Sequence, residues 1–471
     1  MDTQEWIKQQ TILSGRRVAL LSLGCKVNAY ETEGMRELFL QAGAEVVDFE
    51  DTADVYLVNT CSVTNIADRK SRQMLHRAKK QNPQALVVAA GCYAQAAGEK
   101  LALDESVDLV VGNNKKAEIV ALVAQNLSEK TEKSRTFVMD ISKERNYEEL
   151  PIALLTEHTR TFIKVQDGCN QFCSYCIIPY VRGRVRSRKE EDVLAEVKRL
   201  AAEGYREIVL TGIHLSSYGL EKKTEAEPSS EFDATLAAKE TILPLLRLIR
   251  LVHEVDGIER IRLGSLEPRI MTEDFVRELA KLKKVCPHFH LSLQSGCDAT
   301  LKRMNRKYTT AEYRTAVENL RRYLEYPAIT TDIIVGFPGE TEEEFAETLA
   351  FAEEIGFSQI HIFKYSNRKG TVADRLPNQV PEPVKTERSD RLFLLEQELE
   401  TKYRSTFFGK EEEILTEEET ECKGKRYMLG HTTRYVKLAL LTDGSVLPNE
   451  NVKVFVTDER YRDAYVAKVC E

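Results

Sequence analysis

Three closely spaced cysteines in the middle of the chain give the clearest sign of chemistry. Cys169, Cys173 and Cys176 lie in the segment QDGCNQFCSYC, directly after a strand-like run at 161–165. Thiolates are soft ligands that suit iron–sulfur clusters or zinc. Three of them in one short loop can hold three irons of a 4Fe–4S cluster and leave the fourth iron open. A zinc site needs a fourth ligand, and no further Cys or His occurs before His214, so the spacing favours a cluster.

A second set of three cysteines is dispersed through the first part of the chain. Cys25 ends the segment SLGC, Cys61 ends VNTC and Cys92 ends AAGC, each after an apolar, strand-like run. Because the carboxyl ends of parallel strands meet at one ligand-binding edge, these thiols could hold a second cluster. Buried apolar cysteines are the alternative, but three of them at strand ends favour ligands. The other four cysteines lack ligand spacing and are interpreted as structural: Cys286, Cys297, Cys422 and Cys470.

The periodicity of apolar residues predicts three domains that would position these cysteines. Residues 17–140 alternate short apolar runs with helical stretches, which predicts an α/β domain with a parallel sheet. Residues 155–385 contain six further strand–helix units, typical of a partial (βα)6 barrel, interrupted by an insertion at 221–238. Residues 405–471 predict a small all-β barrel, with its strands after the acidic run Glu411–Glu421. The predicted fold class is therefore α/β with a small all-β tail.

Composition sets limits on location and partners. The 471 residues are 42% apolar and 30% charged, as in a soluble globular protein. The absence of a long apolar run and of a signal-peptide pattern predicts a cytoplasmic protein without membrane contact. A formal net charge of −8 means that an RNA partner would need local basic patches. Candidate RNA contacts are Arg182, Arg184, Arg186 and Arg188 in RGRVRSR, and Arg434 and Tyr435 in the tail.

The cysteine loop and the six strand–helix units together resemble the radical S-adenosylmethionine (SAM) superfamily. The resemblance implies a 4Fe–4S cluster on Cys169, Cys173 and Cys176 whose open iron binds SAM. It also implies cofactor contacts at several strand ends, although glycine geometry or buried hydrogen bonding could explain some of the same residues. The implied SAM contacts are Tyr175, Thr211, Gly212, Glu267, Gln294, Gly336 and Pro338.

The resemblance narrows further to the tRNA methylthiotransferases. It rests on SLGCKVNAYETE, NTCSVTN, GCYAQ, GCNQFCSYCIIPYVRGRVRSR, LTGIHL, LSLQSGCD, IVGFPGET and YSNRKGT, and on a tail similar to the RNA-binding TRAM domain. It implies two 4Fe–4S clusters, the second on Cys25, Cys61 and Cys92, with no catalytic residue beyond the cluster ligands. It further implies a tRNA substrate, an electron donor such as flavodoxin or ferredoxin, and a sulfur source.

Within that family, the form Cys-Lys-Val-Asn at Cys25–Asn28 resembles the branch that acts on N6-threonylcarbamoyladenosine. The implied reaction is methylthiolation of carbon 2 of that base at position 37 of tRNA, next to the anticodon. Two alternatives share the architecture: a methylthiotransferase for isopentenyladenosine in tRNA, or one for a ribosomal protein side chain. A third belongs to another class, a non-enzymatic iron–sulfur or zinc protein that binds RNA.

Overall fold

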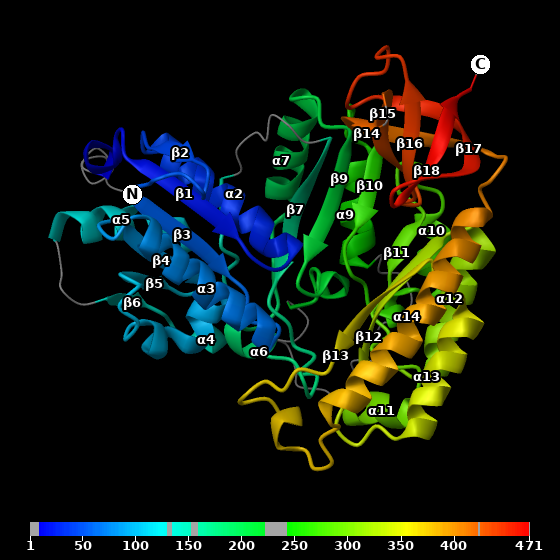
Figure 1. The fold of residues 1–471 in the computed structure, drawn as a ribbon, viewed down its shortest axis with the longest axis horizontal. Coiled ribbons are helices and arrows are strands. Elements are labelled where there is room, and N and C mark those ends of the chain that lie inside the picture. The colour runs from blue at the N-terminus through cyan, green and yellow to red at the C-terminus, as the bar shows by residue number, and fades with distance from the viewer. Residues whose placement is uncertain (1–8, 130–133, 152–158, 222–242, 423, 471) are drawn as a thin grey trace. The chain divides into compact units, whose positions relative to one another are not determined.

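The computed structural model describes residues 9–129, 134–151, 159–221, 243–422 and 424–470 (Figure 1). The chain divides into two compact units. The predicted insertion at 221–238 lies, apart from Glu221, outside the described residues. The first unit comprises Met1–Leu154, Gln166–Arg188 and Ser366–Asp374, and the second comprises Leu155–Val165, Lys189–Tyr365 and Arg375–Glu471. The middle cysteine loop thus groups with the N-terminal residues, and the C-terminal tail groups with the strand–helix units.

A six-stranded parallel sheet is the frame of the first unit. Its strands are β1 (Arg17–Ser22), β2 (Glu45–Val47), β3 (Val55–Thr60), β4 (Leu86–Gly91), β5 (Leu109–Val111) and β6 (Arg135–Phe137), in the order β2-β1-β3-β4-β5-β6. Its helices are α2 (Lys26–Gln41), α3 (Asn65–Gln81), α4 (Cys92–Leu101), α5 (Ile119–Glu129) and the 3-10 turns η1 (Lys116–Glu118) and η2 (Ile141–Lys143).

The apolar runs of this sheet are buried because helices cover both of its faces (Figure 1). Every residue of β3 and β4 is buried. Met35 and Phe39 of α2 pack with α5 on one face, whereas Leu75 of α3 and Tyr93 of α4 pack on the other. The predicted parallel α/β arrangement is confirmed.

The middle cysteine loop follows a strand that passes from the second unit into the first. This strand is β7 (Arg160–Asp167), and its last two residues pair antiparallel with β8 (Arg186–Ser187). The loop and the short helix α6 (Ile178–Val181) lie between these two strands in the sequence. The pairing therefore closes a hairpin-like excursion that carries all three cysteines.

The second unit contains the predicted strand–helix series. Its further strands are β9 (Glu207–Gly212), β10 (Arg260–Leu263), β11 (His288–His290), β12 (Ala328–Val335) and β13 (Gln359–Lys364). Its helices are α7 (Glu190–Ala202), α9 (Pro244–His253), α10 (Glu273–Leu279), α11 (Asp298–Arg303), α12 (Thr310–Tyr323), α13 (Glu342–Ile355) and α14 (Glu382–Ser405), with the turns η3 (Leu215–Ser217), η5 (Pro268–Ile270) and η6 (Ala373–Arg375), the last shared with the first unit.

These strands form two parallel sheets, β7-β9-β10 and β11-β12-β13, joined by the isolated bridges Ile261↔Val285 and Leu266↔Leu291. Helices pack along the outside, as Figure 1 shows for α12, α13 and α14 beside β12 and β13. α12 and α13 each begin with a capping box, at Thr309 and Thr341, which satisfies amide groups at the helix start. The six successive strands confirm the predicted partial barrel.

A closed five-stranded barrel ends the chain. Its strands are β14 (Glu411–Cys422), β15 (Lys425–Thr432), β16 (Lys437–Thr442), β17 (Asn451–Tyr461) and β18 (Ala464–Val469), in the order β14-β15-β16-β18-β17. The sequence placed the strands after the acidic run, which is wrong, because that run is β14 itself. Ile414, Leu415 and Thr416 in its middle are buried, and the exposed glutamates carry charge into solvent.

A buried ionic junction links the strand–helix barrel to this small barrel. The carboxylate of Glu207 is fully buried and lies 2.7 Å from Nε of Arg262 and 2.8 Å from Nε of Arg160. Arg260 approaches the same carboxylate at 3.9 Å. Arg262 also donates hydrogen bonds to the carbonyl oxygens of Thr432, the last residue of β15, and of Thr433, which follows it. One carboxylate therefore compensates several guanidinium groups at the junction.

Glu207→Ala should lower the free energy of unfolding by about 3–5 kcal/mol, because it removes the carboxylate that pairs with the buried guanidinium of Arg262. Burial acts to raise the pKa of Glu207, but Arg262 and Arg160 hold that pKa below its ordinary value. The stabilisation is therefore complete above the unfolded-state pKa of about 4.3 and is lost as the pH falls further. Urea unfolding at pH 7 and near pH 3 measures both effects.

Glu203→Ala, at an exposed position four residues earlier, is the matched control and should change stability by less than about 0.5 kcal/mol. A Glu207→Ala deficit that is as large near pH 3 as at pH 7 would contradict the ionic origin of the stabilisation.

Candidate metal centre

The three dispersed cysteines of the first unit meet at one edge of its sheet. Cys25 follows β1 and caps the N-terminus of α2, Cys61 directly follows β3, and Cys92 directly follows β4 and begins α4. β1, β3 and β4 are neighbours in a parallel sheet, so their carboxyl ends lie at the same edge. The sequence-based placement of this triad at strand ends is confirmed.

The thiols of this triad influence one another electrostatically. Burial raises the pKa of the Cys61 thiol to about 11, and Cys92 and Cys25 act in the same direction. Gly24, just before Cys25, has a φ of +100°, and a Cβ added to it would lie 2.7 Å from Sγ of Cys61. Glycine is therefore needed where these thiols converge. Three convergent thiols are a donor set that gives up its protons when a metal binds.

A fully buried guanidinium lies against this triad. Nε of Arg182 donates a hydrogen bond to Sγ of Cys92 at 3.3 Å. Its other nitrogens bind Glu31 at 2.8 and 3.0 Å, Asp167 at 3.1 and 3.2 Å, and Oδ1 of Asn28 at 2.6 Å. Arg182 thus connects α2 and α4 to the end of β7, just before the second set of cysteines.

Two further buried side chains extend this network. Nζ of Lys116 lies 2.5 Å from the carboxylate of Glu31 and 2.7 Å from Oδ1 of Asn113. The amide nitrogen of Asn113 donates to the carbonyl oxygen of Val181 at 2.7 Å and lies 3.8 Å from Sγ of Cys92. Sequence patterns did not reveal this network. Lys116 and Asn113 lie in none of the recognised motifs, and Glu31, although it lies in SLGCKVNAYETE, has its partners 85 and 151 residues away in the chain.

The second cysteine triad lies in the loop between β7 and α6. Cys169, Cys173 and Cys176 are all half-buried. The backbone N–H of Cys169 donates to the carbonyl of Gly183 at 3.0 Å, and that of Cys176 donates to the carbonyl of Cys173 at 3.0 Å. The N–H of Gln171 points to Sγ of Cys169 at 3.4 Å, as amides do around cluster thiolates. This loop can therefore hold a 4Fe–4S cluster through three thiolates.

The predicted SAM contacts, apart from Tyr175, all follow strands of the second unit. Thr211 and Gly212 end β9, Glu267 follows β10, Gln294 follows β11, and Gly336 and Pro338 follow β12. Tyr175 lies in the cysteine loop of the first unit and is half-buried. These strand-end positions suit a ligand at the barrel mouth, and SAM contact stays a prediction.

Two of these residues have identifiable local roles. The carboxylate of Glu267 lies 3.4 Å from Nε2 of His214. Burial acts to raise the pKa of Glu267, but the His214 hydrogen bond holds it below its ordinary value. Gly336 has a φ of +71°, and a Cβ there would lie 2.3 Å from Cγ of Lys385. The geometric alternative for Gly336 is therefore supported by the structure.

The basic segment RGRVRSR differs from the exposed patch that was expected. Arg182, Arg186 and Arg188 are buried, with exposed fractions of 0, 1 and 7%. Arg186 lies 3.6 Å from Asp167, and Arg188 pairs with Glu149 at 2.8 Å. Interpreting these three as RNA contacts is therefore wrong, because protein carboxylates already compensate their charge. Arg184 alone of the four is exposed.

The two predicted RNA contacts of the tail take part in protein contacts. Arg434 pairs with Glu412 at 3.2 Å and donates to the carbonyl oxygens of Glu325 and Tyr326. The ring of Tyr435 lies under the guanidinium groups of Arg160 and Arg262, at 5.0 and 4.8 Å. Both side chains take part in the junction between the two barrels. Tyr435 is still 40% exposed, and RNA contact by these two residues stays a prediction.

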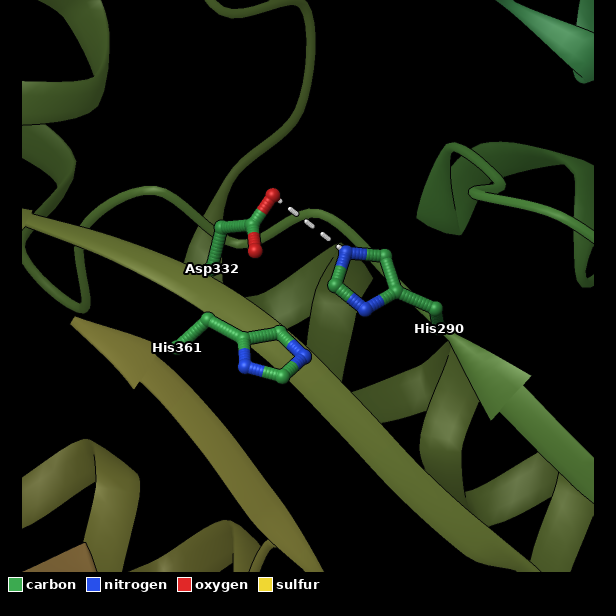
Figure 2. A group of neighbouring side chains, drawn as sticks. All are labelled: His290, Asp332 and His361. Atoms are coloured by element: carbon green, nitrogen blue, oxygen red, sulfur yellow. Dashed lines mark ion pairs between the residues drawn. The ribbon is translucent and has the colours of Figure 1, made fainter. Parts of the chain in front are cut away.

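Three side chains of the second unit form another group of potential metal ligands (Figure 2). His290 of β11, Asp332 of β12 and His361 of β13 offer ligand atoms within 4.8 Å of one another. Nε2 of His290 lies 3.4 Å from Asp332, and its Nδ1 lies 3.1 Å from Oγ1 of Thr330. Two imidazoles and a carboxylate can hold a divalent metal or a polar ligand. Neither histidine lies in a recognised motif, but alternation of side chains along the strands could have placed both of them with Asp332.

Comparison with known proteins agrees with this geometry. The model described as "Radical SAM superfamily" matches residues 163–352, and the model described as "Uncharacterized protein family UPF0004" matches residues 17–112. The structure of the radical SAM methyltransferase TsrM from Kitasatospora setae superimposes with a TM-score of 0.52 at 17% identity, covering 74% of this chain and 73% of that chain. That likeness concerns the fold alone. The fold and the cysteine loop define a radical SAM enzyme.

Curated relatives narrow the class. The "Threonylcarbamoyladenosine tRNA methylthiotransferase MtaB" of Bacillus subtilis is 40% identical over 96% of this chain and 97% of its own length. The protein of that name from Aquifex aeolicus is 41% identical over 88% of this chain and 95% of its own. The "tRNA-2-methylthio-N(6)-dimethylallyladenosine synthase" of Thermoanaerobacter sp. is 36% identical over 84% of this chain and 80% of its own length. The chain belongs to the tRNA methylthiotransferase family, which implies SAM and a 4Fe–4S cluster as cofactors.

The helices of the described residues include none that is long and apolar enough to cross a membrane.

Gly168→Ala should disrupt the middle cysteine loop, because a Cβ there would lie 1.8 Å from the carbonyl oxygen of Arg184. The collision should cost about 1–3 kcal/mol beyond the backbone strain and should reduce the iron bound after anaerobic reconstitution. Gly15→Ala is the matched control, since Gly15 has the same φ of +70° and nothing within 4 Å. Equal iron content and equal urea stability in the two variants would contradict the prediction.

Proposed function

We propose that this enzyme methylthiolates carbon 2 of N6-threonylcarbamoyladenosine at position 37 of tRNA, using two 4Fe–4S clusters and SAM. The observation that carries the proposal is the convergence of Cys25, Cys61 and Cys92 at one sheet edge, in the same compact unit as the loop of the other triad. Binding SAM at one open iron accounts only for the middle cysteines. The additional thiols therefore support a second cluster.

The chemistry explains why such a reaction needs cofactors. The C–H bond at carbon 2 of adenine is unactivated, and a radical cofactor can break it while the protein binds, orients and excludes side reactions. In the proposal, Cys169, Cys173 and Cys176 hold the cluster that binds SAM, and Cys25, Cys61 and Cys92 hold the cluster that carries sulfur. Each triad supplies three thiolates, so one iron of each cluster stays open to a ligand.

The choice of substrate rests on relatives and on one segment. The Bacillus subtilis and Aquifex aeolicus relatives carry names that specify threonylcarbamoyladenosine, and Cys25–Asn28 reads Cys-Lys-Val-Asn. The runner-up substrate is isopentenyladenosine, which is also called dimethylallyladenosine. The name of the Thermoanaerobacter relative, at lower identity, supports it. The reaction also requires an electron donor such as flavodoxin or ferredoxin, and a sulfur source.

The exposed side of the middle cysteine loop offers a contact for RNA. The guanidinium of Arg184 lies 4.6 Å from the ring centroid of Phe172, and the ring of Phe172 packs edge-on against Tyr180 at 5.8 Å. Tyr180 is 49% exposed. Aromatic rings beside an arginine suit an unstacked base and its phosphate. We therefore propose that Arg184 and Tyr180 contact the anticodon loop of the tRNA.

Nucleoside mass analysis of tRNA tests the substrate. Cells that lack this protein should lose the methylthio form of threonylcarbamoyladenosine and accumulate its precursor, and the wild-type chain should restore the modified form. The Cys61→Ala chain should not restore it, because one ligand of the proposed sulfur-carrying cluster is missing.

Cys286→Ala is the control, since this buried cysteine lies outside both triads and should restore the modified base. Loss of only the dimethylallyl product in the deleted cells would assign the runner-up substrate. Full complementation by Cys61→Ala would refute the second cluster.

Tyr180→Ala and Arg184→Ala should each weaken tRNA binding. Base stacking on a ring or guanidinium is worth about 1–3 kcal/mol, which corresponds to a roughly 5- to 150-fold higher Kd for tRNA. Equilibrium binding with labelled tRNA at fixed salt measures the change. Phe393→Ala on α14 is the control, because Phe393 is equally exposed, at 50%. Unchanged Kd values in both loop variants would exclude this contact surface.

A further inference from the structure

Arg182 has a complete set of partners although it is wholly buried. A guanidinium has five N–H donors. Here Nε donates to Cys92, one terminal nitrogen donates to Glu31 and Asp167, and the other donates to Glu31 and Asn28. A buried arginine so fully satisfied is held in one position. Its bond to Sγ of Cys92 therefore has a fixed direction.

Ion pairs compensate the buried charges around this contact. Lys116 and Arg182 both pair with Glu31, and Arg182 and Arg186 both lie near Asp167. The Nε–H of Arg182 is directed instead at Sγ of Cys92, at 3.3 Å.

Arg182 also holds the other cysteine loop. Asp167, which it binds, lies two residues before Cys169 and accepts a hydrogen bond from the N–H of Gly168 at 2.8 Å. Gly183, the next residue, accepts a hydrogen bond from the N–H of Cys169 at 3.0 Å. One short segment therefore touches a ligand of one triad and the backbone of the other.

We infer that Arg182 is a positioning residue for the sulfur-carrying cluster: it fixes the Cys92 thiolate as a ligand and raises the reduction potential of that cluster. The inference rests on the proposed function, since it presumes a cluster on Cys25, Cys61 and Cys92. Hydrogen bonds and positive charge at a cluster sulfur stabilise the reduced, more negative state. Residues that support metal ligands in this way typically change metal affinity by about 10- to 100-fold.

The full-length chain with Cys169, Cys173 and Cys176 all changed to Ala isolates this cluster. After anaerobic reconstitution, we compare this chain with versions that also carry Arg182→Met or Arg182→Lys. Arg182→Met should lower the midpoint potential, measured by EPR-monitored titration, and should speed iron loss to a chelator by about tenfold or more. Arg182→Lys keeps the charge but loses the fork of donors, and its potential should lie between the other two.

Arg77→Met, on the exposed surface of α3, is the matched control and should leave potential and iron loss unchanged. Circular dichroism and urea unfolding separate a cluster effect from loss of fold. If Arg182→Met does not fold, Arg182→Lys decides the question through its lower potential.

An Arg182→Met chain, or in its place an Arg182→Lys chain, with unchanged potential and unchanged iron loss would overturn the inference. If the parent chain with the three Ala substitutions binds no iron, the two-cluster proposal itself fails, and this role of Arg182 fails with it. The parent chain thus distinguishes the two failures.

Discussion

The desolvation of the Arg182 guanidinium constrains the part of the first unit where both cysteine triads are held. A buried charge costs several kcal/mol unless ion pairs and hydrogen bonds replace its water. Arg182 obtains these from Glu31 on α2, Cys92 at the start of α4 and Asp167 at the end of β7. If these three elements separated, the guanidinium would become exposed or would lose its ion pairs and hydrogen bonds. The ionic contacts therefore fix where the strand-end cysteines and the cysteine loop are anchored.

The second unit also contains buried charges that need partners, but there a carboxylate lies among several guanidinium groups. At its junction, the single carboxylate of Glu207 compensates Arg160 and Arg262, while Glu417 pairs with Arg160 and Glu413 pairs with Arg260. Apolar packing alone would allow the small barrel to dock in several ways. Directional hydrogen bonds from Arg262 to the turn carbonyls select one orientation. In both units, buried arginines specify which elements meet, whereas apolar residues supply most of the driving force.

Local sequence patterns predicted the features that are determined by residues close together in the chain. The parallel sheet, the six strand–helix units and the strand-end positions of Cys25, Cys61 and Cys92 all followed from apolar periodicity. Burial of charge did not, because it depends on partners far away in the chain. Four alternating arginines suggested one exposed face. Two of them, Arg186 and Arg188, are instead buried and lie close to the carboxylates of Asp167 and Glu149. In the same way, the glutamate-rich run did not look like a strand, although it forms β14. Its few buried residues are enough to contribute to the core once the neighbouring strands close the barrel.

The buried charges bear on the interpretation of the dispersed cysteines. Three cysteines placed only for apolar packing would need no cation, because a protonated thiol is neutral and weakly polar. Instead, the guanidinium of Arg182 is aimed at Cys92 by four other hydrogen-bonding directions, and Asn113 lies beside the same sulfur. Hydrogen bonds from a charged donor are stronger than those between neutral groups. A guanidinium directed in this way at one sulfur of the triad supports the proposed metal ligation over simple core packing.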